Sequence, residues 1–270
     1  MAKVISIVNQ KGGVGKTNVC ANLGICLAKH GKKVLVVDVD SQGSLTLSLG
    51  HEQPDKLSIT LATMMEKVLN ESLAEPRECI LHHNEGVDLV PANNKLAAID
   101  ISLINVMRRE TVLKRYINII KNDYDIVLLD CQPSLGMLTI NALAASDSVI
   151  IPVQAEYLPV KGLMQLLQTI AQVNKEINPR LGIEGILLTM VDHTNDAKNI
   201  ISKINETYGS KLRIYKQQIP RSVNARESSR KGVSIFTHAP HSKIADAYES
   251  LTREVLGIEI KGQRDIFNAI

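Results

Sequence analysis

The 270-residue sequence contains no tryptophan and only two phenylalanines, so its core must be built from Ile, Leu, Val and Ala. Its four cysteines (Cys20, Cys26, Cys79 and Cys131) form no CxxC pair, which favours reduced thiols over a metal centre or a disulfide scaffold. No apolar run reaches about 18 residues and no signal-peptide core is present, so neither export nor a membrane span is predicted. An aliphatic core of this kind favours parallel strands covered by helices on both faces.

The net charge of +3 conceals an uneven distribution. Ten Lys and Arg residues but only two acids lie between Lys198 and Lys243, a net charge of +8 in 46 residues that leaves −5 for the rest of the chain. A basic stretch on a nearly neutral protein is consistent with a surface that binds polyanions. A solvated surface that happens to be basic is the alternative, and charge alone does not decide between them.

Short β-branched runs alternate with longer helical stretches, which is the pattern of βαβ units. We expect strands at residues 4–8, 33–38, 87–90, 126–130, 148–153 and 183–189, and helices at residues 17–30, 135–145, 159–177, 197–208 and 243–256. Asn195 and Asp196 mark the start of the fourth helix. The predicted fold is an α/β fold with a mostly parallel twisted sheet and helices on both faces. We expect one domain over residues 1–257 and a C-terminal tail over residues 258–270.

A glycine-rich segment, Asn9-Gln-Lys-Gly-Gly-Val-Gly-Lys-Thr17, follows the first predicted strand and precedes a predicted helix. Strand, glycine-rich turn and helix are the context of a phosphate loop, in which glycines let the main-chain N–H groups converge on phosphate oxygens. In such a loop Lys16 would neutralise the β- and γ-phosphates and the Thr17 hydroxyl would ligate Mg²⁺. A glycine-rich turn with a chance GKT is the alternative, which the strand–helix context disfavours.

The loop departs from the general pattern, because Gln10 stands where the first glycine belongs and a second lysine, Lys11, is present. KGGVGKT resembles the deviant Walker A family, the ParA/MinD group of P-loop ATPases. The resemblance implies that Lys11 reaches across an ATP-sandwiched homodimer to the partner's nucleotide. It also implies the ATP-binding residues, which are Lys11, Gly12, Gly13, Val14, Gly15, Lys16, Thr17 and Asn18.

Two further segments carry carboxylates at the ends of predicted strands. Asp38 and Asp40 lie on the same side of their strand by alternation, in a segment similar to the family's VDxDPQG with Ser41 in place of proline. The resemblance implies that Asp40 orients the attacking water. Asp130 ends the Walker B-like run Tyr124-Asp-Ile-Val-Leu-Leu-Asp130, and Cys131-Gln-Pro-Ser134 resembles the switch motif DxPPS. The implied Mg²⁺ ligands, partly through water, are Thr17, Asp38 and Asp130; the implied catalytic residues are Lys11, Lys16 and Asp40.

The resemblance continues through residues 151–157, 185–190 and 219–223, covers most of residues 3–256, and is closest to the ParA branch with its Soj-like proteins. It implies that Pro220 and Arg221 help to enclose adenine. It also implies that the dimer binds DNA through basic residues of the C-terminal half, for which we expect Arg221, Arg226, Arg230 and Lys231. No aromatic residue is interleaved with them, so recognition of double-stranded DNA should be non-specific.

The sequence therefore predicts a Mg²⁺-dependent ATPase with weak intrinsic activity that helps to partition a plasmid, chromosome or mobile element. A ParB-like partner would stimulate hydrolysis, and the protein would be cytoplasmic and nucleoid-associated. The loop begins at residue 11, which leaves no room for an N-terminal DNA-reading domain. One alternative is a MinD-like membrane-cycling regulator of division-site placement, but residues 258–270 carry two acids against two bases where it needs a basic amphipathic helix. An iron–sulfur redox protein lacks well-placed cysteines, and a metabolic kinase gives Lys11 no role.

Overall fold

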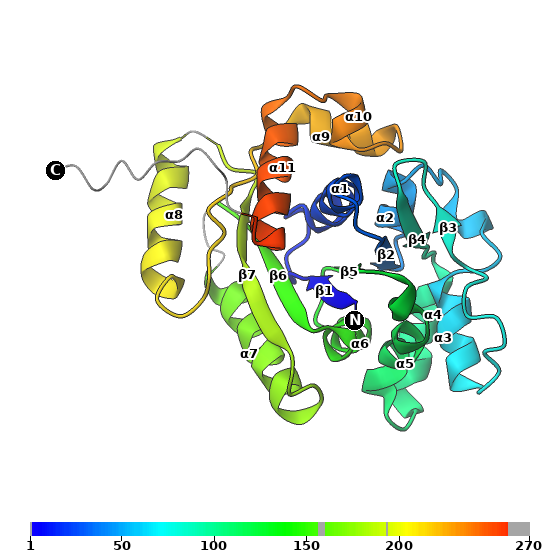
Figure 1. Ribbon diagram of the computed structural model, residues 1–270. Helices are drawn as coiled ribbons and strands as arrows, with labels where there is room; N and C mark the ends of the chain where they lie inside the picture. Colours follow the sequence, from blue (N-terminus) through cyan, green and yellow to red (C-terminus); the bar gives the residue numbers. More distant parts are fainter. Residues whose placement is uncertain (1, 156–159, 193, 259–270) are drawn as a thin grey trace.

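The computed structural model describes residues 2–155, 160–192 and 194–258 (Figure 1). In this part of the chain seven strands form one sheet, in the order β3-β4-β2-β5-β1-β6-β7. Only β3 is antiparallel to its neighbour. The strands are β1 (Lys3–Ile7), β2 (Val34–Val39), β3 (Leu81–His82), β4 (Val87–Val90), β5 (Ile126–Cys131), β6 (Ser148–Gln154) and β7 (Gly182–Thr189). The predicted α/β class and mostly parallel sheet are confirmed.

Helices cover both faces of the sheet (Figure 1). One face carries α1 (Lys16–Lys29), α2 (Ser44–Ser48), α9 (Val223–Arg230), α10 (Ile235–His238) and α11 (Lys243–Leu256). The other carries α3 (Leu61–Leu69), α4 (Lys95–Ser102), α5 (Val112–Ile120), α6 (Met137–Ala145) and α7 (Val160–Glu176), while α8 (Asn195–Tyr208) lies beyond β7. Single 3₁₀ turns occupy residues 54–56, 103–105, 109–111 and 121–123.

Alternation along each strand divides the core into two layers. In β1, Ile5 and Ile7 pack beneath α1 and α11, whereas Val4 contributes to the opposite layer with α5 and α6. The same division holds in β2, where Val36 and Val37 belong to different layers. Both faces of these central strands are therefore buried, which explains why most of their residues are apolar.

The structure confirms the predicted strands and, where they are described, the five predicted helices to within two residues. The fourth of these helices begins at Asn195, as the pair Asn195 and Asp196 indicates, and the hydroxyl of Thr194 accepts a hydrogen bond from the N–H of Ala197 and caps it. Strand β3 and helices α2, α9 and α10 were not predicted, and the sequence set no bounds for α3, α4 and α5. Residues 156–159, which include part of a resembling segment and the expected start of α7, lie outside the described residues, as does the tail beyond Ile258. The domain boundary at residue 257 stays a prediction.

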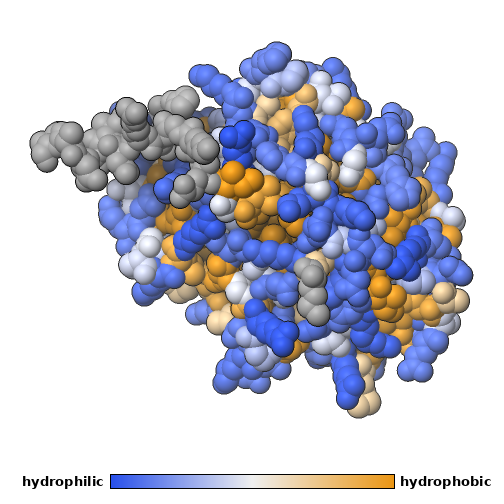
Figure 2. Space-filling view, in the orientation of Figure 1, coloured by the Kyte–Doolittle hydropathy of each residue, from blue (hydrophilic) through white to orange (hydrophobic). Residues whose placement is uncertain are grey.

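The surface is largely polar in the view of Figure 2, with hydrophobic patches of limited extent between hydrophilic side chains. Among the described residues, no helix combines the length and the apolar character that crossing a membrane requires.

Candidate active site

The glycine-rich loop leaves the carboxyl end of β1, in the middle of the sheet between β5 and β6 (Figure 1). Gly13 and Gly15 adopt φ values of 76° and 84°, a left-handed conformation that favours glycine. Side-chain hydrogen bonds from Asn9 and Thr189 help to hold the loop. The Asn9 amide donates to the carbonyl of Pro152 (2.6 Å) and its oxygen accepts from the N–H of Lys11 (2.9 Å). The Thr189 hydroxyl donates to the carbonyl of Val14 (2.8 Å), so the ends of β6 and β7 both brace the loop.

Helix α1 begins directly after this loop, at Lys16. In the described chain no side chain caps its N-terminus, and its first turn contains no acidic residue. The N–H groups of the first turn and the positive end of the helix dipole therefore face the loop, as an anion site requires. The Lys16 side chain is buried, which lowers the pKa of its ammonium, while the nearby carboxylates of Asp130 and Asp40 and the thiol of Cys131 oppose that shift.

Asp130 is the penultimate residue of β5, lies beside Lys16 and is 1% exposed. Neither of its carboxylate oxygens accepts a hydrogen bond of normal geometry in the described structure, although the Thr17 hydroxyl lies nearby. Burial and the neighbouring Asp38 raise the pKa of Asp130 well above its usual range, and the Thr17 hydroxyl and the Lys16 ammonium lower it only in part. A buried carboxylate without a partner is costly, and a divalent cation would satisfy it. Hard oxygen donors from Asp130 and Thr17 fit Mg²⁺, which is held by few protein ligands and keeps several waters.

Asp38 is also buried, but its oxygens already have partners. One oxygen accepts from both the N–H and the hydroxyl of Thr46 (2.8 and 2.7 Å), and the other from the N–H of Asp40 (3.2 Å). Burial raises the pKa of Asp38 to about 6, although these hydrogen bonds oppose the shift. Asp38 thus fixes the start of α2 and of the segment that carries Asp40, while Asp40 itself is partly exposed.

Two cavities flank the loop. One of about 210 Å³ lies beside the start of α1 and is lined by Asn18, Met190, Pro220, Arg221, Arg226 and Tyr248, among others. The other, of about 450 Å³, lies between Lys11 and Val14 on one side and Pro133 and Ser134 on the other. The predicted base-side residues Pro220 and Arg221 and the predicted switch segment therefore lie on opposite sides of the loop.

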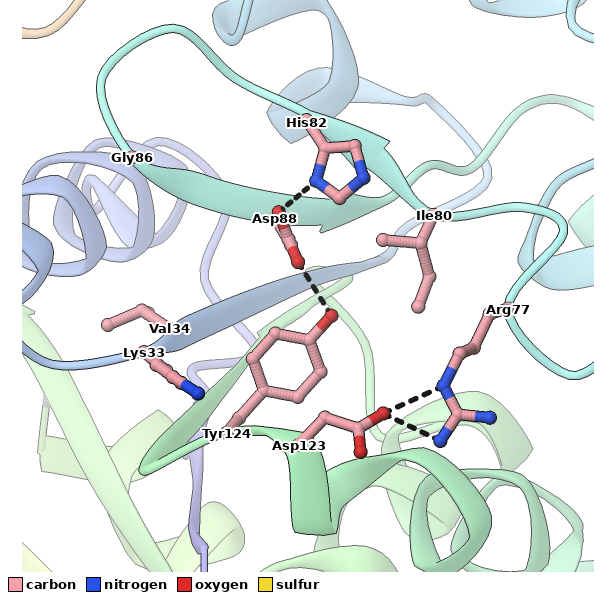
Figure 3. A pocket seen from close by; sticks show the side chains of 9 residues that line it. All are labelled: Lys33, Val34, Arg77, Ile80, His82, Gly86, Asp88, Asp123 and Tyr124. Atoms are coloured by element: carbon pink, nitrogen blue, oxygen red, sulfur yellow. Dashed lines mark hydrogen bonds and ion pairs between the residues drawn. The ribbon is translucent and has the colours of Figure 1, made fainter.

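A third cavity, of about 370 Å³, lies at the amino ends of β2 and β4, opposite the loop (Figure 3). Its acidic groups are already engaged, because Asp88 accepts from the Tyr124 hydroxyl (2.8 Å) and pairs with His82, and Asp123 pairs with Arg77. It offers no glycine-rich turn or helix N-terminus for a phosphate. The candidate active site is the loop edge.

Comparisons with known proteins agree with this geometry. A family model described as an AAA domain (AAA_31) matches residues 2–183. The sporulation initiation inhibitor protein Soj of Bacillus subtilis is 44% identical over 260 residues, covering 94% of this chain and 98% of Soj. The chromosome-partitioning ATPase Soj of Treponema pallidum is 37% identical, covering 98% of this chain and 100% of its own length. The chain belongs to the ParA/Soj family of P-loop ATPases.

A solved structure titled cobyrinic acid a,c-diamide synthase from Mycobacterium smegmatis, with bound ATP analogue and magnesium, is similar to this family member. Its TM-score is 0.82 at 36% identity, covering 95% of each chain. That structure contains an ATP analogue together with magnesium, which supports ATP and Mg²⁺ as the cofactors of this family. The comparisons confirm the family that the sequence motifs indicate.

In this ParA/Soj family member, the basic stretch between Lys198 and Lys243 does not form one surface. Ile204 and Tyr208 of α8 pack in one core layer, whereas Ala225 of α9 packs against the other. Figure 1 places the two helices on different sides of α11. The basic residues of α8 and those of α9 therefore lie apart, because segments close in sequence diverge over the sheet. Arg226 and Arg230 remain together on α9, with Lys231 at its end, and all three are exposed.

Three supporting residues of the site were not predicted: Asn9, Thr46 and Thr189. Asn9 precedes the motif, and Thr46 follows Asp38 by eight residues. Thr189 lies 175 residues from the carbonyl that it binds. A polar residue at the carboxyl end of an apolar strand is a signal that could have found Thr189, because ligands bind at that edge of parallel sheets.

Proposed function

We propose that this protein is a partition ATPase that binds ATP·Mg²⁺ at the loop edge, dimerises around it and then binds DNA non-specifically. The orphaned carboxylate of Asp130 beside Lys16 and Thr17 carries the nucleotide part of the proposal. Thr17, Asp38 and Asp130 would hold the ion, Asp130 through water. Main-chain N–H groups of Gly12, Gly13, Gly15 and Lys16 would cradle the phosphates.

The adenine base would occupy the cavity beside α1, where Pro220 and Arg221 form part of the lining with Asn18. Arg221 also pairs with Asp192 (2.9 Å), which holds its guanidinium near the rim. Asp40, at the end of the β2 segment, would orient the attacking water. In this arrangement binding and hydrolysis depend on different residues, so they can be separated by substitution.

The Lys11 side chain of each subunit would act on the nucleotide that is bound by the other subunit. Its side chain is exposed, whereas that of Lys16 is buried in its own loop. A cation delivered by the second subunit can neutralise charge that develops on the transferred phosphate. This arrangement would make hydrolysis depend on dimerisation, and the dimer on ATP.

The DNA-binding surface would be α9. Arg226 and Arg230 are four residues apart and therefore lie on one helix face, with Lys231 beside them. Arg221 lies just before this helix, but its contact with Asp192 places it at the base cavity as well. Two copies of this face in a dimer would roughly double the number of phosphate contacts, which would make DNA binding depend on ATP.

The proposal includes a ParB-like partner that stimulates hydrolysis and a cytoplasmic, nucleoid-associated location. The DNA that is partitioned would be a plasmid, a chromosome or a mobile element. Relatives named for chromosome partitioning support it. The MinD-like alternative depends on the tail beyond Ile258, which lies outside the described residues.

Filter binding of duplex DNA, with ATP or ADP and at several salt concentrations, tests the proposal. With ATP the affinity should fall with salt with a log–log slope of about −4 to −7, because each phosphate contact releases about 0.9 counterion. The variant Arg230→Glu/Lys231→Glu should lose this binding. Arg226 lines the base cavity, so substituting it also tests nucleotide binding and is best made separately.

The matched control is Lys198→Glu/Lys203→Glu, the same charge change on α8, which should bind DNA as the wild type does. If the α9 variant binds DNA as tightly as wild type while the α8 variant does not, the surface is elsewhere. Co-sedimentation with anionic vesicles in the same buffer would instead favour the membrane-cycling alternative.

A further inference from the structure

Helices α1 and α11 lie side by side (Figure 1). The contact between the end of α1 and α11 brings together three side chains that the nucleotide site does not use. Cys26 lies in the last turn of α1, and His30, four residues later, is the C-cap residue of that helix, so the two lie on the same side of its end. Glu249 faces them from α11. The Cys26 thiol donates to one oxygen of Glu249 (3.1 Å), and Nε2 of His30 lies 3.0 Å from the other. All three donor atoms lie within 4.8 Å of one another.

The cluster is open on one side only. Cys26 is fully buried, whereas the side chains of His30 and Glu249 are 25% and 36% exposed. An ion could therefore enter from solvent past the imidazole and the carboxylate and meet the sulfur at the bottom. The thiol is enclosed by the two helices, so the ion would lie between them.

Thiolate, imidazole and carboxylate together form a donor set that suits a borderline-soft divalent ion such as Zn²⁺. Zinc bonds of about 2.0–2.3 Å in a tetrahedron place neighbouring donor atoms about 3.3–3.6 Å apart. The Cys26 sulfur lies 3.1 Å from one oxygen of Glu249 and Nε2 of His30 lies 3.0 Å from the other, so the carboxylate needs to turn to present one oxygen to an ion between the three side chains. Hard ions such as Mg²⁺ and Ca²⁺ prefer oxygen donors alone, so this set discriminates against the ion of the nucleotide site.

We propose that Cys26, His30 and Glu249 bind one Zn²⁺ ion, with water in the fourth position. On binding, the Cys26 proton leaves to solvent and a sulfur–zinc bond replaces the S–H bond. Burial raises the pKa of Cys26 to about 12, so the proton stays on sulfur until a metal ion displaces it. Thiolate and carboxylate would then balance the two charges of the ion.

Arg253, one turn further along α11, donates to Glu249 (3.0 Å) and would compete with the ion. The ammonium of Lys29 lies over the Phe236 ring, 4.7 Å from its centroid. The Arg253 side chain is 43% exposed, so it can turn to solvent when an ion takes the carboxylate. The bound ion would link the end of α1 to α11. Because Tyr248, next to Glu249, lines the cavity proposed for the base, this link would also fix the position of one wall of that cavity.

Cobalt(II) is the probe for this site, since a thiolate ligand gives it a charge-transfer band. The full chain, reduced and without a polyhistidine tag, is titrated with Co²⁺ and then with Zn²⁺. Wild type should bind one Co²⁺ with a thiolate band, which Zn²⁺ then abolishes. Cys26→Ser should lose the band, and His30→Gln and Glu249→Gln should each weaken Co²⁺ binding by more than about tenfold, since even outer-shell partners are worth that much.

The matched control is Cys79→Ser, which removes another buried thiol and should keep the band. The Cys79 thiol is hydrogen-bonded to the Tyr116 hydroxyl (3.1 Å) and lies outside the proposed site. A wild type without the band, or a Cys26→Ser variant that retains it, would overturn the proposal. If Cys26→Ser does not fold, His30→Gln and Glu249→Gln decide: wild-type Co²⁺ affinity in both would also overturn it. Zn²⁺ should raise the Tm of wild type and not that of a folded Cys26 or His30 variant.

Discussion

The ammonium of Lys16 donates a hydrogen bond to the main-chain carbonyl of Lys11, 3.2 Å away. The two lysines of the motif are thus joined through the curl of the loop, yet their side chains have different environments. Lys16 is 7% exposed and Lys11 is exposed. This difference is the basis for our proposal that Lys16 serves a phosphate within its own loop and that Lys11 serves a group outside it.

Lys16→Ala should lose ATP binding, because no other described side chain places an ammonium inside the loop. Hydrogen bonds to charged groups contribute about 1.5–3 kcal/mol, so the affinity should fall by roughly 10- to 100-fold or more. A fluorescent ATP analogue measures the loss, with Lys32→Ala, on the exposed turn after α1, as the control. ATP binding of wild-type strength in Lys16→Ala would refute this assignment.

Asp130→Asn should stabilise the nucleotide-free protein while abolishing Mg²⁺-dependent hydrolysis. Burial raises the pKa values of Asp130 and, to about 6, of Asp38, so the folded chain binds these protons more tightly than the unfolded chain. Their contribution to stability is present in full below about pH 4 and is lost as the pH rises through the folded-state pKa. Removing the Asp130 carboxyl should add about 1–3 kcal/mol to the free energy of unfolding at pH 7.5.

Urea denaturation at pH 5, 6 and 7.5, without nucleotide, measures this effect. The stability of wild type should fall across that range more than the stability of Asp130→Asn. A variant that is less stable than wild type at pH 7.5, or one that still hydrolyses ATP, would contradict the metal-ligand role of Asp130.

The sequence predicted the parts of the site that are local in the chain. The loop, the β1–α1 context and the carboxylates at the ends of β2 and β5 all follow from spacing and alternation, because parallel strands share one carboxyl edge. The contact between Thr189 and Val14 could not be predicted in this way, because it depends on the order β1-β6-β7 and spans 175 residues. Helix α9 was missed since residues 223–230 have almost no apolar periodicity, and only Ala225 packs on the core.

Thr189→Val should weaken ATP binding although Thr189 need not touch the nucleotide. Its hydroxyl holds the carbonyl of Val14 at 2.8 Å, and valine keeps the shape but removes the donor. A hydrogen bond of about 1 kcal/mol corresponds to a loss of roughly fivefold in affinity if the loop must be ordered to bind. Thr189→Ser restores the hydroxyl and should restore most of the affinity. Equal ATP affinity in the valine and serine variants would show that the hydrogen bond from residue 189 to the carbonyl of Val14 does not contribute to ATP binding.

Asp40→Ala should separate binding from hydrolysis. Asp40 is partly exposed at the end of the β2 segment, and its carboxylate accepts from the N–H of Gln42 (3.0 Å). If it orients water, the variant should bind ATP normally and accumulate as a dimer, while turnover falls by roughly 100-fold or more. Phosphate release under single-turnover conditions, beside light scattering, measures both properties. Wild-type turnover in Asp40→Ala would exclude the role.

Lys11→Ala and Gly12→Val should both lose ATP-dependent dimerisation, for different reasons. The first removes the cation proposed to reach the partner's nucleotide, which should weaken the dimer by roughly 10- to 100-fold. The second adds a side chain where the folded subunit has room, since a Cβ at Gly12 would lie 3.9 Å from Cβ of Pro133, an ordinary contact. Any obstruction would therefore come from an approaching second subunit.

Both variants should keep ATP binding as monomers, measured with the same fluorescent analogue, because neither change removes Lys16 or disturbs Gly13 and Gly15. Light scattering with ATP, and with ADP as the negative control, reports the dimer. The two variants test the sandwich independently, one through charge and one through shape. If both form ATP-dependent dimers at wild-type concentrations, the subunits do not meet across this loop, and the exposed position of Lys11 has another cause.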